Sequence, residues 1–592
     1  MYTFFTQGPM CGVFAISSSD INNAGEKVIE GLKKLEYRGY DSWGVATSKE
    51  MIKEVGKISN SNAIFIPDTK AIGHSRWATH GGVTKENSHP HRYKKVTLVH
   101  NGIFENYLAE KDRLLEKGET FLSETDSEVI VHLIQEQLDL SYDAKSAIQN
   151  VSKAITGRFS IVVMIEGVDE IFVARRGSPL IIGRGKNEYE NTTFIASDIP
   201  AFLEYTNIVN YIDDDEMAII KNDEVDFYNL VSGKHIKKRN IEVLWKEEIA
   251  EKGDYNHFMI KEIFDQKQSL ASAINHSDKE IAEFISALQS GNGVYMVACG
   301  TAHKASIAAE YYFSQIAGRK INVVPASEML AFERFINEKT VLFAVSQSGE
   351  TADILEVLEL GKKRGAKILS ITNVESSSIA RISDNHLPIR AGKEKAVAST
   401  KATTSQMALL LLLAYADDNR LNEGRLMLQD LASNVNDLLN PRYEEYIKSV
   451  AETLNDCSNI FIIGRNSLFP MALESAIKIL EVSYIHAQGF AAGEMKHGPI
   501  ALIEQGTPCI VLGCDSETIS NAMELKSRGA TIIGVAHENN ALFDQWLKIP
   551  SAGTAISIAS ILPIQILSYY LATLRGLDPD MPRNLAKSVT VK

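Results

Sequence analysis

Cysteine is scarce in this chain, and no two cysteines are closely spaced. The five are an odd count among 592 residues, and none forms a C-x-x-C pair: Cys11, Cys299, Cys457, Cys509 and Cys514. Disulfide frameworks use even sets of cysteines, and structural zinc sites use closely spaced ligands. The pattern therefore argues against both and indicates a reducing compartment, so we expect a cytoplasmic protein.

Positive charge is also in short supply. The chain has 61 Lys and Arg against 75 Asp and Glu, which gives a formal net charge of −14. Nucleic acids and anionic membranes are bound by basic side chains that neutralise phosphate. We therefore expect neither as a partner. An anionic metabolite would have to be held by local donors.

Long apolar runs are nearly absent. Residues 552–574 come closest, but polar or helix-breaking residues interrupt them: Thr554, Ser557, Ser560, Pro563, Gln565 and Ser568. We interpret this stretch as a buried core helix and not as a membrane span. The start of the chain shows no basic region followed by an apolar run, so we expect no secretory signal.

The first 240 residues have the composition of a sheet-rich domain, and the total length favours three or four domains. Short β-rich runs separated by polar turns occupy residues 11–16, 95–99, 159–165, 170–174 and 193–196. They predict many strands with a few helices. The charged region 221–252 predicts the end of this domain and a connector.

From about residue 280 the sequence alternates strand, loop and helix. Six apolar runs, typical of parallel strands buried on both faces, lie at residues 294–298, 341–345, 367–371, 460–463, 509–512 and 531–535. The last three follow the order of the first three, and residues 515–518 resemble residues 348–351. We therefore predict two copies of one α/β unit.

Cys11 opens a strand-like run, where a lone cysteine is usually a small buried hydrophobe. Other residues suggest chemistry around it. Arg76 can clamp a carboxylate, and Asn101 beside Gly102 can form an oxyanion hole. Asp126 offers a carboxylate for an ammonium group. Each has a plainer alternative, which is a surface ion pair for Arg76, a turn for Asn101 and Gly102, and a helix cap for Thr125 or Asp126.

Hydroxyl-rich loops follow two strands of the second half. Residues 346–351 read Ser-Gln-Ser-Gly-Glu-Thr before a helical stretch, and Thr301 follows another strand. Backbone N–H groups and hydroxyls at the start of a helix favour phosphate. The alternative is ordinary capping by Ser348 or Thr351.

A second set of residues suggests sugar chemistry. Lys478 and Glu481 share one face of a predicted helix over residues 471–484, where a solvated ion pair is the usual outcome. His497 follows between glycines. Moving a proton between neighbouring sugar carbons needs a base such as a carboxylate, and ring opening needs an acid such as histidine.

In order along the chain, these motifs resemble one family, the glucosamine-6-phosphate synthases, which are isomerizing glutamine–fructose-6-phosphate aminotransferases. The matching segments are residues 11–14, 35–42, 73–81, 100–102, 125–130, 298–301, 346–351, 398–401, 483–487, 496–499 and 582–591. The resemblance implies an α+β N-terminal-nucleophile glutaminase domain, an αββα sandwich, followed by two α/β SIS-type sugar-isomerase domains with parallel sheets. The implied divisions are an extension or remnant 1–9, glutaminase 10–240, connector 241–280, isomerase domains 281–430 and 431–575, and an active-site tail 576–592.

For the glutaminase domain, the resemblance implies that the Cys11 thiolate attacks the side-chain amide of glutamine, with its own free α-amino group as the base. Asn101 and Gly102 would stabilise the oxyanion. The implied glutamine-binding residues are Arg76, Trp77, His80 and Asp126, and Trp77 would also gate the ammonia path.

For the isomerase domains, the resemblance makes Glu481 the isomerisation base, His497 the ring-opening residue, Lys478 their charged neighbour and Lys587 an imine-forming lysine. The implied sugar-phosphate contacts are Thr301, Ser346, Gln347, Ser348, Thr351, Val397 and Ser399. In the family the ring-opening histidine comes from a neighbouring subunit, which implies a homodimer. No metal-ligand spacing and no G-x-G-x-x-G motif before a helix are visible, so we expect no metal and no cofactor.

Three departures from the family pattern stand out. The family cysteine becomes the first residue after removal of Met, whereas residues 1–9 precede Met10 here, so we expect residues 2–9 to be an added segment, a mis-called start or a cleaved leader. Ala302 replaces a serine, and residues 391–395 are more basic than usual.

The leading hypothesis is the synthesis of glucosamine 6-phosphate from fructose 6-phosphate and glutamine, at the start of amino-sugar synthesis. The alternatives are another ketose phosphate as acceptor, which Ala302 motivates, or a non-catalytic sugar-phosphate sensor.

Overall fold

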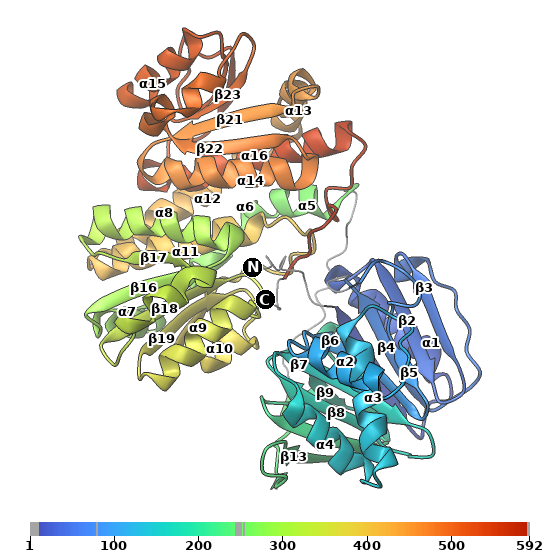
Figure 1. Cartoon of the computed structure of the whole chain (residues 1–592). Coiled ribbons are helices and arrows are strands. Elements are labelled where there is room, and N and C mark those ends of the chain that lie inside the picture. The colour runs from blue at the N-terminus through green and yellow to red at the C-terminus, as the bar shows by residue number, and fades with distance from the viewer. Residues whose placement is uncertain (1–10, 78–80, 243–251, 253–254, 589–592) are drawn as a thin grey trace. The chain divides into compact units, whose positions relative to one another are not determined.

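The computed structural model describes residues 11–77, 81–242, 252 and 255–588 (Figure 1). The predicted extension 1–9 and the candidate residue His80 lie outside them. Contacts divide the chain into two compact units. Unit 1 comprises Met1–Ile249 with Ser588–Lys592, and unit 2 comprises Ala250–Lys587.

Unit 1 contains two antiparallel sheets with the strand orders β15-β11-β9-β10-β1-β4-β2-β3 and β14-β13-β12-β8-β7-β6-β5. The strands of the first sheet are β1 (Gly12–Ser18), β2 (Ser42–Thr47), β3 (Met51–Val55), β4 (Lys70–Arg76), β9 (Ile181–Arg184), β10 (Thr192–Ala196), β11 (Ile208–Tyr211) and β15 (Ile241–Glu242). Those of the second are β5 (His91–Tyr93), β6 (Val96–Gly102), β7 (Phe159–Ile165), β8 (Ile171–Arg176), β12 (Glu216–Lys221), β13 (Glu224–Asn229) and β14 (His235–Ile236). The helices are α1 (Ala24–Lys34), α2 (Tyr107–Glu116), α3 (Asp126–Asp139), α4 (Ala144–Ala154) and the short 3-10 turns η1 (Glu36–Arg38), η2 (Ile58–Asn60), η3 (Asn187–Tyr189) and η4 (Ile199–Ala201).

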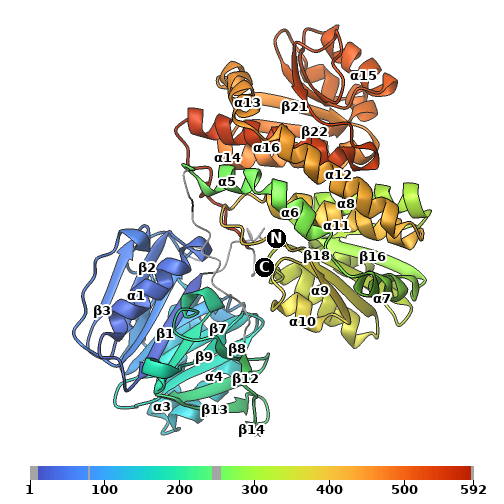
Figure 2. The same cartoon turned by 180° about the vertical axis from the view of Figure 1, so that it is seen from behind.

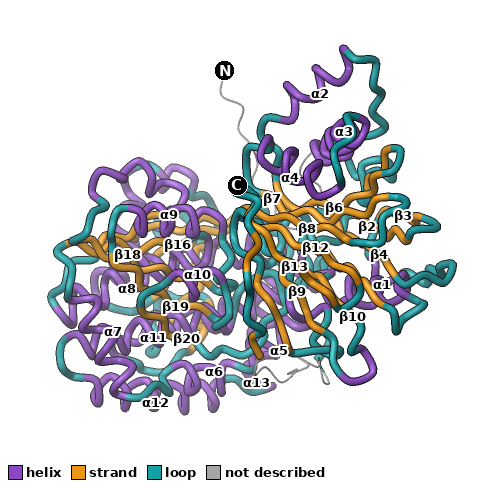
Figure 3. Tube along the Cα trace, turned by 90° about the horizontal axis from the view of Figure 1, so that it is seen from below, coloured by secondary structure: helices purple, strands orange, loops and turns teal. Residues whose placement is uncertain are grey.

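The two sheets of unit 1 pack face to face between layers of helices. Figure 3 shows α3 and α4 on one side of the strands and α1 on the other. On β1, Val13 and Ala15 join the core between the sheets, whereas Phe14 and Ile16 pack in the core beneath α1. Successive side chains of a strand point to opposite faces. The continuous apolar run after Cys11 therefore reflects a strand buried on both faces, in the αββα arrangement that the family resemblance implies.

Unit 2 contains two parallel five-stranded sheets with the orders β17-β16-β18-β19-β20 and β22-β21-β23-β24-β25. The strands are β16 (Gly293–Ala298), β17 (Asn322–Pro325), β18 (Thr340–Ser346), β19 (Lys367–Thr372), β20 (Asn385–Pro388), β21 (Asn459–Gly464), β22 (His486–Ala491), β23 (Pro508–Leu512), β24 (Thr531–Ala536) and β25 (Gln545–Lys548). Numbered within each copy, both orders read 2-1-3-4-5, so the predicted repeat is confirmed.

The helices of unit 2 cover both sheets and fill the space between them. They are α5 (Phe258–Phe264), α6 (Gln266–Ala273), α7 (Asp278–Gln289), α8 (Gly300–Ala317), α9 (Ala352–Lys363), α10 (Ser378–Ile382), α11 (Lys401–Asp417), α12 (Leu421–Leu438), α13 (Pro441–Leu454), α14 (Phe469–Ser483), α15 (Ser516–Lys526) and α16 (Ile556–Leu574), with the 3-10 turns η5 (Ala326–Phe335), η6 (Asn466–Leu468), η7 (Ala492–His497), η8 (Pro499–Leu502) and η9 (Gly553–Ala555). Figure 1 shows α8, α11, α14 and α16 in the layer between the two sheets. One apolar core runs through this layer.

The apolar stretch near the C-terminus forms α16, which packs against α13 and α14 (Figure 2). Within the described ranges, Gly553–Leu574 is the one helix long and apolar enough to cross a membrane, and 89% of its most apolar window is buried inside the protein. Its polar residues are satisfied there; for example, Gln565 accepts a hydrogen bond from Gln266. The prediction of a buried core helix is confirmed.

Candidate active sites

In unit 1, Cys11 lies at the start of β1 beside the end of β4. The backbone N–H of Trp77 donates to Cys11 Sγ at 3.2 Å. Burial raises the pKa of the thiol to about 11, although the Trp77 N–H and the Arg76 charge favour the thiolate. A thiol with this pKa stays protonated at neutral pH, so its attack on an amide requires a base.

Asn101 and Gly102 end β6 next to this thiol. Asn101 Nδ2 donates to the carbonyl oxygen of Cys11 at 2.8 Å, which places the amide beside the nucleophile. Gly102 has φ +135°, and a Cβ there would lie 2.0 Å from the carbonyl oxygen of Arg158. The close approach of this backbone therefore requires glycine. Of the two residues, Asn101 directly contacts Cys11.

Arg76 and Asp126 are both buried, which removes the surface ion pair as an interpretation of Arg76. The Arg76 guanidinium donates to the carbonyl oxygens of Gly82 at 3.0 Å and Gly81 at 3.2 Å. Burial lowers the pKa of Arg76, and the nearby Cys11, Asp41 and Asp126 oppose that effect.

Asp126 is the first residue of α3, and its carboxylate accepts from the backbone N–H of Phe104 at 2.8 Å. The helix cap itself is the neighbouring Thr125, whose hydroxyl accepts from the N–H of Glu128. The capping interpretation therefore holds for Thr125, whereas the Asp126 carboxyl group accepts from the Phe104 N–H and from the Ser127 hydroxyl at 3.1 Å.

In unit 2, the loops after β16 and β18 lie at the point where the strand order of the first sheet reverses. Ligands of open parallel sheets bind at such a point, beyond the carboxyl ends of the strands. The loop 347–351 follows β18, and Thr301 is the second residue of α8, which follows β16 after Cys299. The sequence-predicted phosphate residues therefore come from adjacent strands.

The conformation of the loop after β18 depends on a small residue, Gly349, and on hydrogen bonds of hydroxyl groups. The Ser346 hydroxyl accepts from the N–H of Gly349 at 3.0 Å and lies 3.2 Å from the Thr351 hydroxyl. Gly349 has φ +68°, and a Cβ there would lie 2.0 Å from Ser377 Oγ. Thr351 is the N-cap residue of α9, but its side chain makes no capping hydrogen bond. The capping alternative for Thr351 is therefore not supported, and the hydroxyl remains at the positive end of α9.

The second copy has a different loop at the same position. Only residues 513–515 separate β23 from α15, and the cap of α15 is Asp515, which accepts from the N–H of Thr518 at 2.9 Å. A carboxylate at the start of this helix repels phosphate and already occupies its N–H groups. The predicted likeness of residues 515–518 to residues 348–351 is therefore misplaced, because Asp515 and not Thr518 occupies the position of Thr351.

Lys478 and Glu481 lie on α14 together with a residue that the sequence interpretation did not single out, Glu474. Lys478 Nζ is 2.6 Å from Glu481 and 3.5 Å from Glu474, and Lys478 and Glu474 are fully buried. The solvated ion pair is therefore wrong. Burial raises the pKa of Glu474 to about 7, and Thr301 donates to this carboxylate at 3.1 Å. The two carboxylates raise the pKa of Lys478, so the lysine stays charged.

Lys587, in the C-terminal tail, forms an ion pair with the buried Glu394. Glu394 also accepts from Ser399 Oγ at 3.1 Å and from the N–H groups of Thr400 and Ala402 at the start of α11. The sequence interpretation missed Glu394, because it appeared only as part of a charged stretch. Val397 is fixed to the same tail, since its N–H donates to the carbonyl oxygen of Asp580 at 3.0 Å.

His497 differs from the other candidates because it is exposed. It ends η7, and within the part of the chain that the structure describes no hydrogen bond or ion pair joins it to Lys478 or Glu481. The structure therefore brings Lys478 and Glu481 together without His497. Among the phosphate candidates, Gln347 offers its backbone carbonyl to the N–H of Asn373 at 3.1 Å.

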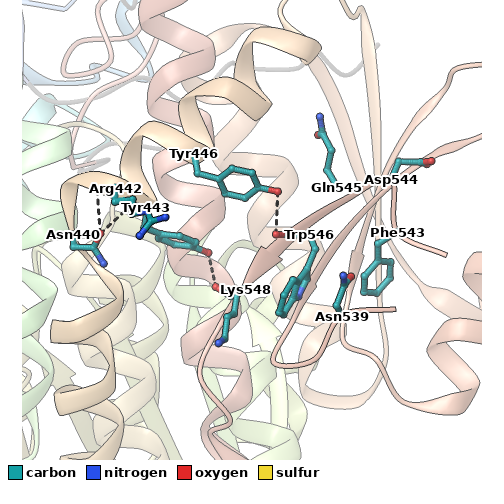
Figure 4. A pocket seen from close by; sticks show the side chains of 10 residues that line it. All are labelled: Asn440, Arg442, Tyr443, Tyr446, Asn539, Phe543, Asp544, Gln545, Trp546 and Lys548. Atoms are coloured by element: carbon teal, nitrogen blue, oxygen red, sulfur yellow. Dashed lines mark hydrogen bonds between the residues drawn. The ribbon is translucent and has the colours of Figure 1, made fainter. Parts of the chain in front are cut away.

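A separate groove of about 580 Å³ lies beside the edge strand β25 (Figure 4). Its aromatic walls include Tyr443 and Tyr446, whose hydroxyls donate to the backbone carbonyls of Lys548 and Trp546. These bonds satisfy carbonyls of the exposed sheet edge. None of the predicted site residues lines this groove.

Comparisons with known proteins agree with the two folds. Residues 76–204 match the glutamine amidotransferase domain, and residues 287–416 and 453–575 match the SIS domain. The chain is thus a glutamine amidotransferase joined to a pair of SIS domains, as the fold class predicted from the sequence requires.

Relatives of full length identify the family. The protein of Thermococcus kodakarensis named glutamine–fructose-6-phosphate aminotransferase [isomerizing] is 40% identical, over 98% of this chain and 100% of its own. The protein of the same name from Thermus thermophilus is 37% identical with the same coverage. The solved C-terminal domain of glucosamine-fructose-6-phosphate aminotransferase from Francisella tularensis is 30% identical over 56% of this chain and all of its own, with a TM-score of 0.52. The chain belongs to the family of isomerizing glutamine–fructose-6-phosphate aminotransferases.

Proposed function

We propose that this protein transfers the amide nitrogen of glutamine to fructose 6-phosphate, giving glucosamine 6-phosphate and glutamate, at the start of cytoplasmic amino-sugar synthesis. The observation that carries the proposal is that one chain holds a half-buried thiol beside an amide donor. In a second unit it holds an ion pair between the buried Lys478 and the half-buried Glu481, and Lys587 paired with the buried Glu394. A sensor of sugar phosphates would need neither the thiol nor the Lys478–Glu481 pair.

In the first half-reaction, Cys11 Sγ attacks the amide carbon of glutamine, and the carbonyl electrons move to the oxygen, where Asn101 and Gly102 donate hydrogen bonds. Collapse of this adduct expels ammonia and leaves a thioester, which water hydrolyses to glutamate. Arg76 binds the α-carboxylate of glutamine and Asp126 its α-amino group, with Trp77 and His80 completing the site. The thiol proton needs an acceptor, and we assign this role to the α-amino group of Cys11, which requires a mature chain that begins at Cys11.

In the second half-reaction, the phosphate of the sugar lies against Thr301 and the loop of Ser346, Gln347, Ser348 and Thr351, and Val397 and Ser399 contact the sugar. Lys587 forms an imine with the open-chain ketone. Ammonia then replaces the lysine, and the water lost in imine formation balances the water that hydrolyses the thioester. Glu481 carries the proton from C1 to C2, and Lys478 holds its carboxylate.

Ring opening needs an acid, and we assign it to His497 of a second copy in a homodimer. The exposed position of His497 supports this assignment.

The test measures glutamate and glucosamine 6-phosphate separately in one assay with glutamine and fructose 6-phosphate. Equal amounts of both products are expected from the wild-type protein. Cys11→Ala should form neither product from glutamine but should keep synthesis from added ammonia. Tight binding of fructose 6-phosphate with no turnover under either condition would favour the sensor. Turnover of a different ketose phosphate alone would show another acceptor.

A further inference from the structure

A buried histidine, His74, lies between the two sheets of unit 1 and contacts the proposed oxyanion hole. It stands on β4 two residues after Ile72, which belongs to the core between the sheets. Alternate residues of a strand share a face, so His74 points from the first sheet toward β6 of the second. Its side chain is fully buried. Nothing in the proposed reaction uses it directly.

The hydrogen bonds around His74 determine which of its nitrogens carries a proton. Nε2 is 3.1 Å from the backbone carbonyl oxygen of His100 and 3.0 Å from Asn101 Oδ1. A carbonyl oxygen can only accept, so Nε2 must carry the hydrogen. Burial lowers the pKa of His74 to about 3, so the ring is neutral and Nδ1 is unprotonated.

The same bonds determine the orientation of the Asn101 amide. Its Nδ2 donates to the carbonyl oxygen of Cys11, which can only accept, and its Oδ1 faces the Nε2–H of His74. With the amide turned by 180°, an NH₂ group would face the N–H of His74, and an oxygen would face the oxygen of Cys11. Both contacts would be repulsive. His74 therefore holds the NH₂ group of Asn101 toward the nucleophile, where one of its two hydrogens remains for the substrate oxygen.

The orientation of the His74 ring is itself fixed by its neighbours. His89 stacks on it with ring centroids 4.1 Å apart and an angle of 14° between the planes, and His89 Nδ1 accepts from the N–H of His100 at 3.2 Å. This packing leaves little freedom for the His74 ring to rotate.

We propose that His74 is a positioning residue for glutamine hydrolysis, which orients the Asn101 amide so that its NH₂ group can donate to the oxyanion formed on the glutamine amide. The inference rests on the proposed glutaminase function. Substrate binding through Arg76 and Asp126 does not involve this contact. Loss of His74 should therefore slow the chemical step without weakening the binding of glutamine.

The test compares two amide replacements of different reach. The Nε2 of glutamine occupies the position of the imidazole Nε2, whereas the Nδ2 of asparagine reaches only the position of Nδ1. His74→Asn should lower kcat for glutamate release by about 10²-fold, with the KM for glutamine changed less than about threefold, since a lost oxyanion donor affects mainly the transition state. His74→Gln should recover at least about tenfold of this loss. Synthesis from added ammonia should be unchanged in both variants.

The matched control is His132→Leu, which removes another buried imidazole of unit 1, one stacked on Tyr93. It should lower Tm but leave kcat unchanged. A second measurement uses glutamate γ-semialdehyde, whose adduct with Cys11 carries an oxyanion. The affinity for this aldehyde should fall in His74→Asn as kcat does, while the affinity for glutamate stays constant.

Equal kcat in His74→Asn and wild type, equal loss in the Gln and Asn variants, or an equal loss in His132→Leu would each overturn the positioning role while leaving the glutaminase function intact. A wild-type protein that releases no glutamate would instead overturn the function, and the inference with it.

Discussion

At the scale of single residues, the second unit places an acid where water cannot reach it. Glu474 is fully buried on α14, and one of its oxygens, Oε2, has no hydrogen-bond partner among the described residues. Lys478 at 3.5 Å offsets the charge only in part, because Lys478 is closer to Glu481. This explains why burial dominates and the pKa of Glu474 rises to about 7.

Glu474→Gln should make the protein less sensitive to alkaline pH. The pKa of this carboxyl is higher in the folded state than its unfolded value of 4.5. Its contribution to stability is therefore complete below pH 4.5 and is lost as pH rises through about 7, by about 3 kcal/mol in total. The amide cannot ionise and can still accept from Thr301. Between pH 5.5 and 8, Tm should fall by roughly 5 °C less in the variant than in the wild type.

Thermal unfolding at the two pH values checks this prediction. Other buried acids, such as Glu262 with a pKa raised to about 8, contribute equally to both proteins and cancel in the comparison. Glu452→Gln, on the exposed surface of α13, is the control and should follow the wild type. An identical pH dependence in Glu474→Gln and wild type would show that Glu474 is not buried as a neutral acid.

Lys587→Met should separate the two half-reactions. Glu394 would lose its cationic partner, and no imine could form, so glucosamine 6-phosphate production should fall by more than about 10³-fold while glutamate release persists. Borohydride added with fructose 6-phosphate should label the wild-type peptide that contains Lys587 and should leave the variant unlabelled, as peptide mass spectrometry can show. Label on another lysine would contradict the assigned role.

At the scale of elements, the two copies of the parallel sheet share one strand order but differ in the loop that joins the third strand to its helix. The first copy has five residues between β18 and α9, with hydroxyls and a glycine. The second has three between β23 and α15 and ends in Asp515. The longer loop leaves the start of its helix available to a phosphate, whereas the shorter one fills it with a carboxylate. We therefore expect the phosphate to bind at the first copy and not at the second.

Ser348→Ala should weaken the binding of fructose 6-phosphate with little effect on kcat. A hydrogen bond to a charged phosphate contributes about 1.5 to 3 kcal/mol, which corresponds to a rise in KM of roughly 10- to 100-fold. Ser516→Ala, at the first residue of α15 in the second copy, is the control and should leave KM unchanged. Steady-state kinetics with ammonia as the nitrogen donor measures the sugar site alone. Equal effects of the two substitutions would contradict the assignment of the phosphate to the first copy.

The elements themselves follow closely from local sequence, because short apolar runs bounded by turn residues, such as residues 531–535, favour strands buried on both faces. Phe159–Ile165 has the predicted bounds, and the other runs differ by one to three residues at their ends. What failed was the comparison between copies, since matching letters aligned Thr518 with Thr351. The number of residues between the end of the strand and the start of the helix, five in the first copy and three in the second, was the better guide to which residues of the two loops correspond.

The candidate sites were predictable where a motif carries the chemistry and were missed where a partner is distant in sequence. Cys11 and Asn101 were singled out from their motifs, and the structure places them in contact. Glu394 was missed because its role depends on its ion pair with Lys587, which lies 193 positions away in the sequence. His74 lies inside a motif that was noted, but its role depends on β4 and β6 facing each other across two sheets, which local patterns do not show.

At the scale of the whole molecule, the two units have separate cores and separate chemistry, so the start of the chain should affect only one of them. Cys11 Sγ has its pKa raised to about 11 and needs a base. If that base is the α-amino group of Cys11, a protein that retains residues 1–10 carries an amide nitrogen there and cannot accept the proton.

We therefore expect glutaminase activity to depend on whether the chain begins at Cys11, which a measurement of the intact mass reveals. Protein that begins at Cys11 should release glutamate, whereas protein that retains the preceding ten residues should release at least about 10²-fold less, the usual contribution of a general base. Both should make glucosamine 6-phosphate equally well from ammonia, because the sugar site lies in unit 2. Full glutaminase activity in protein whose mass includes residues 1–10 would eliminate the free amine as the base. A side chain of unit 1 would then have to accept the thiol proton, and the residues buried around Cys11 would be the candidates.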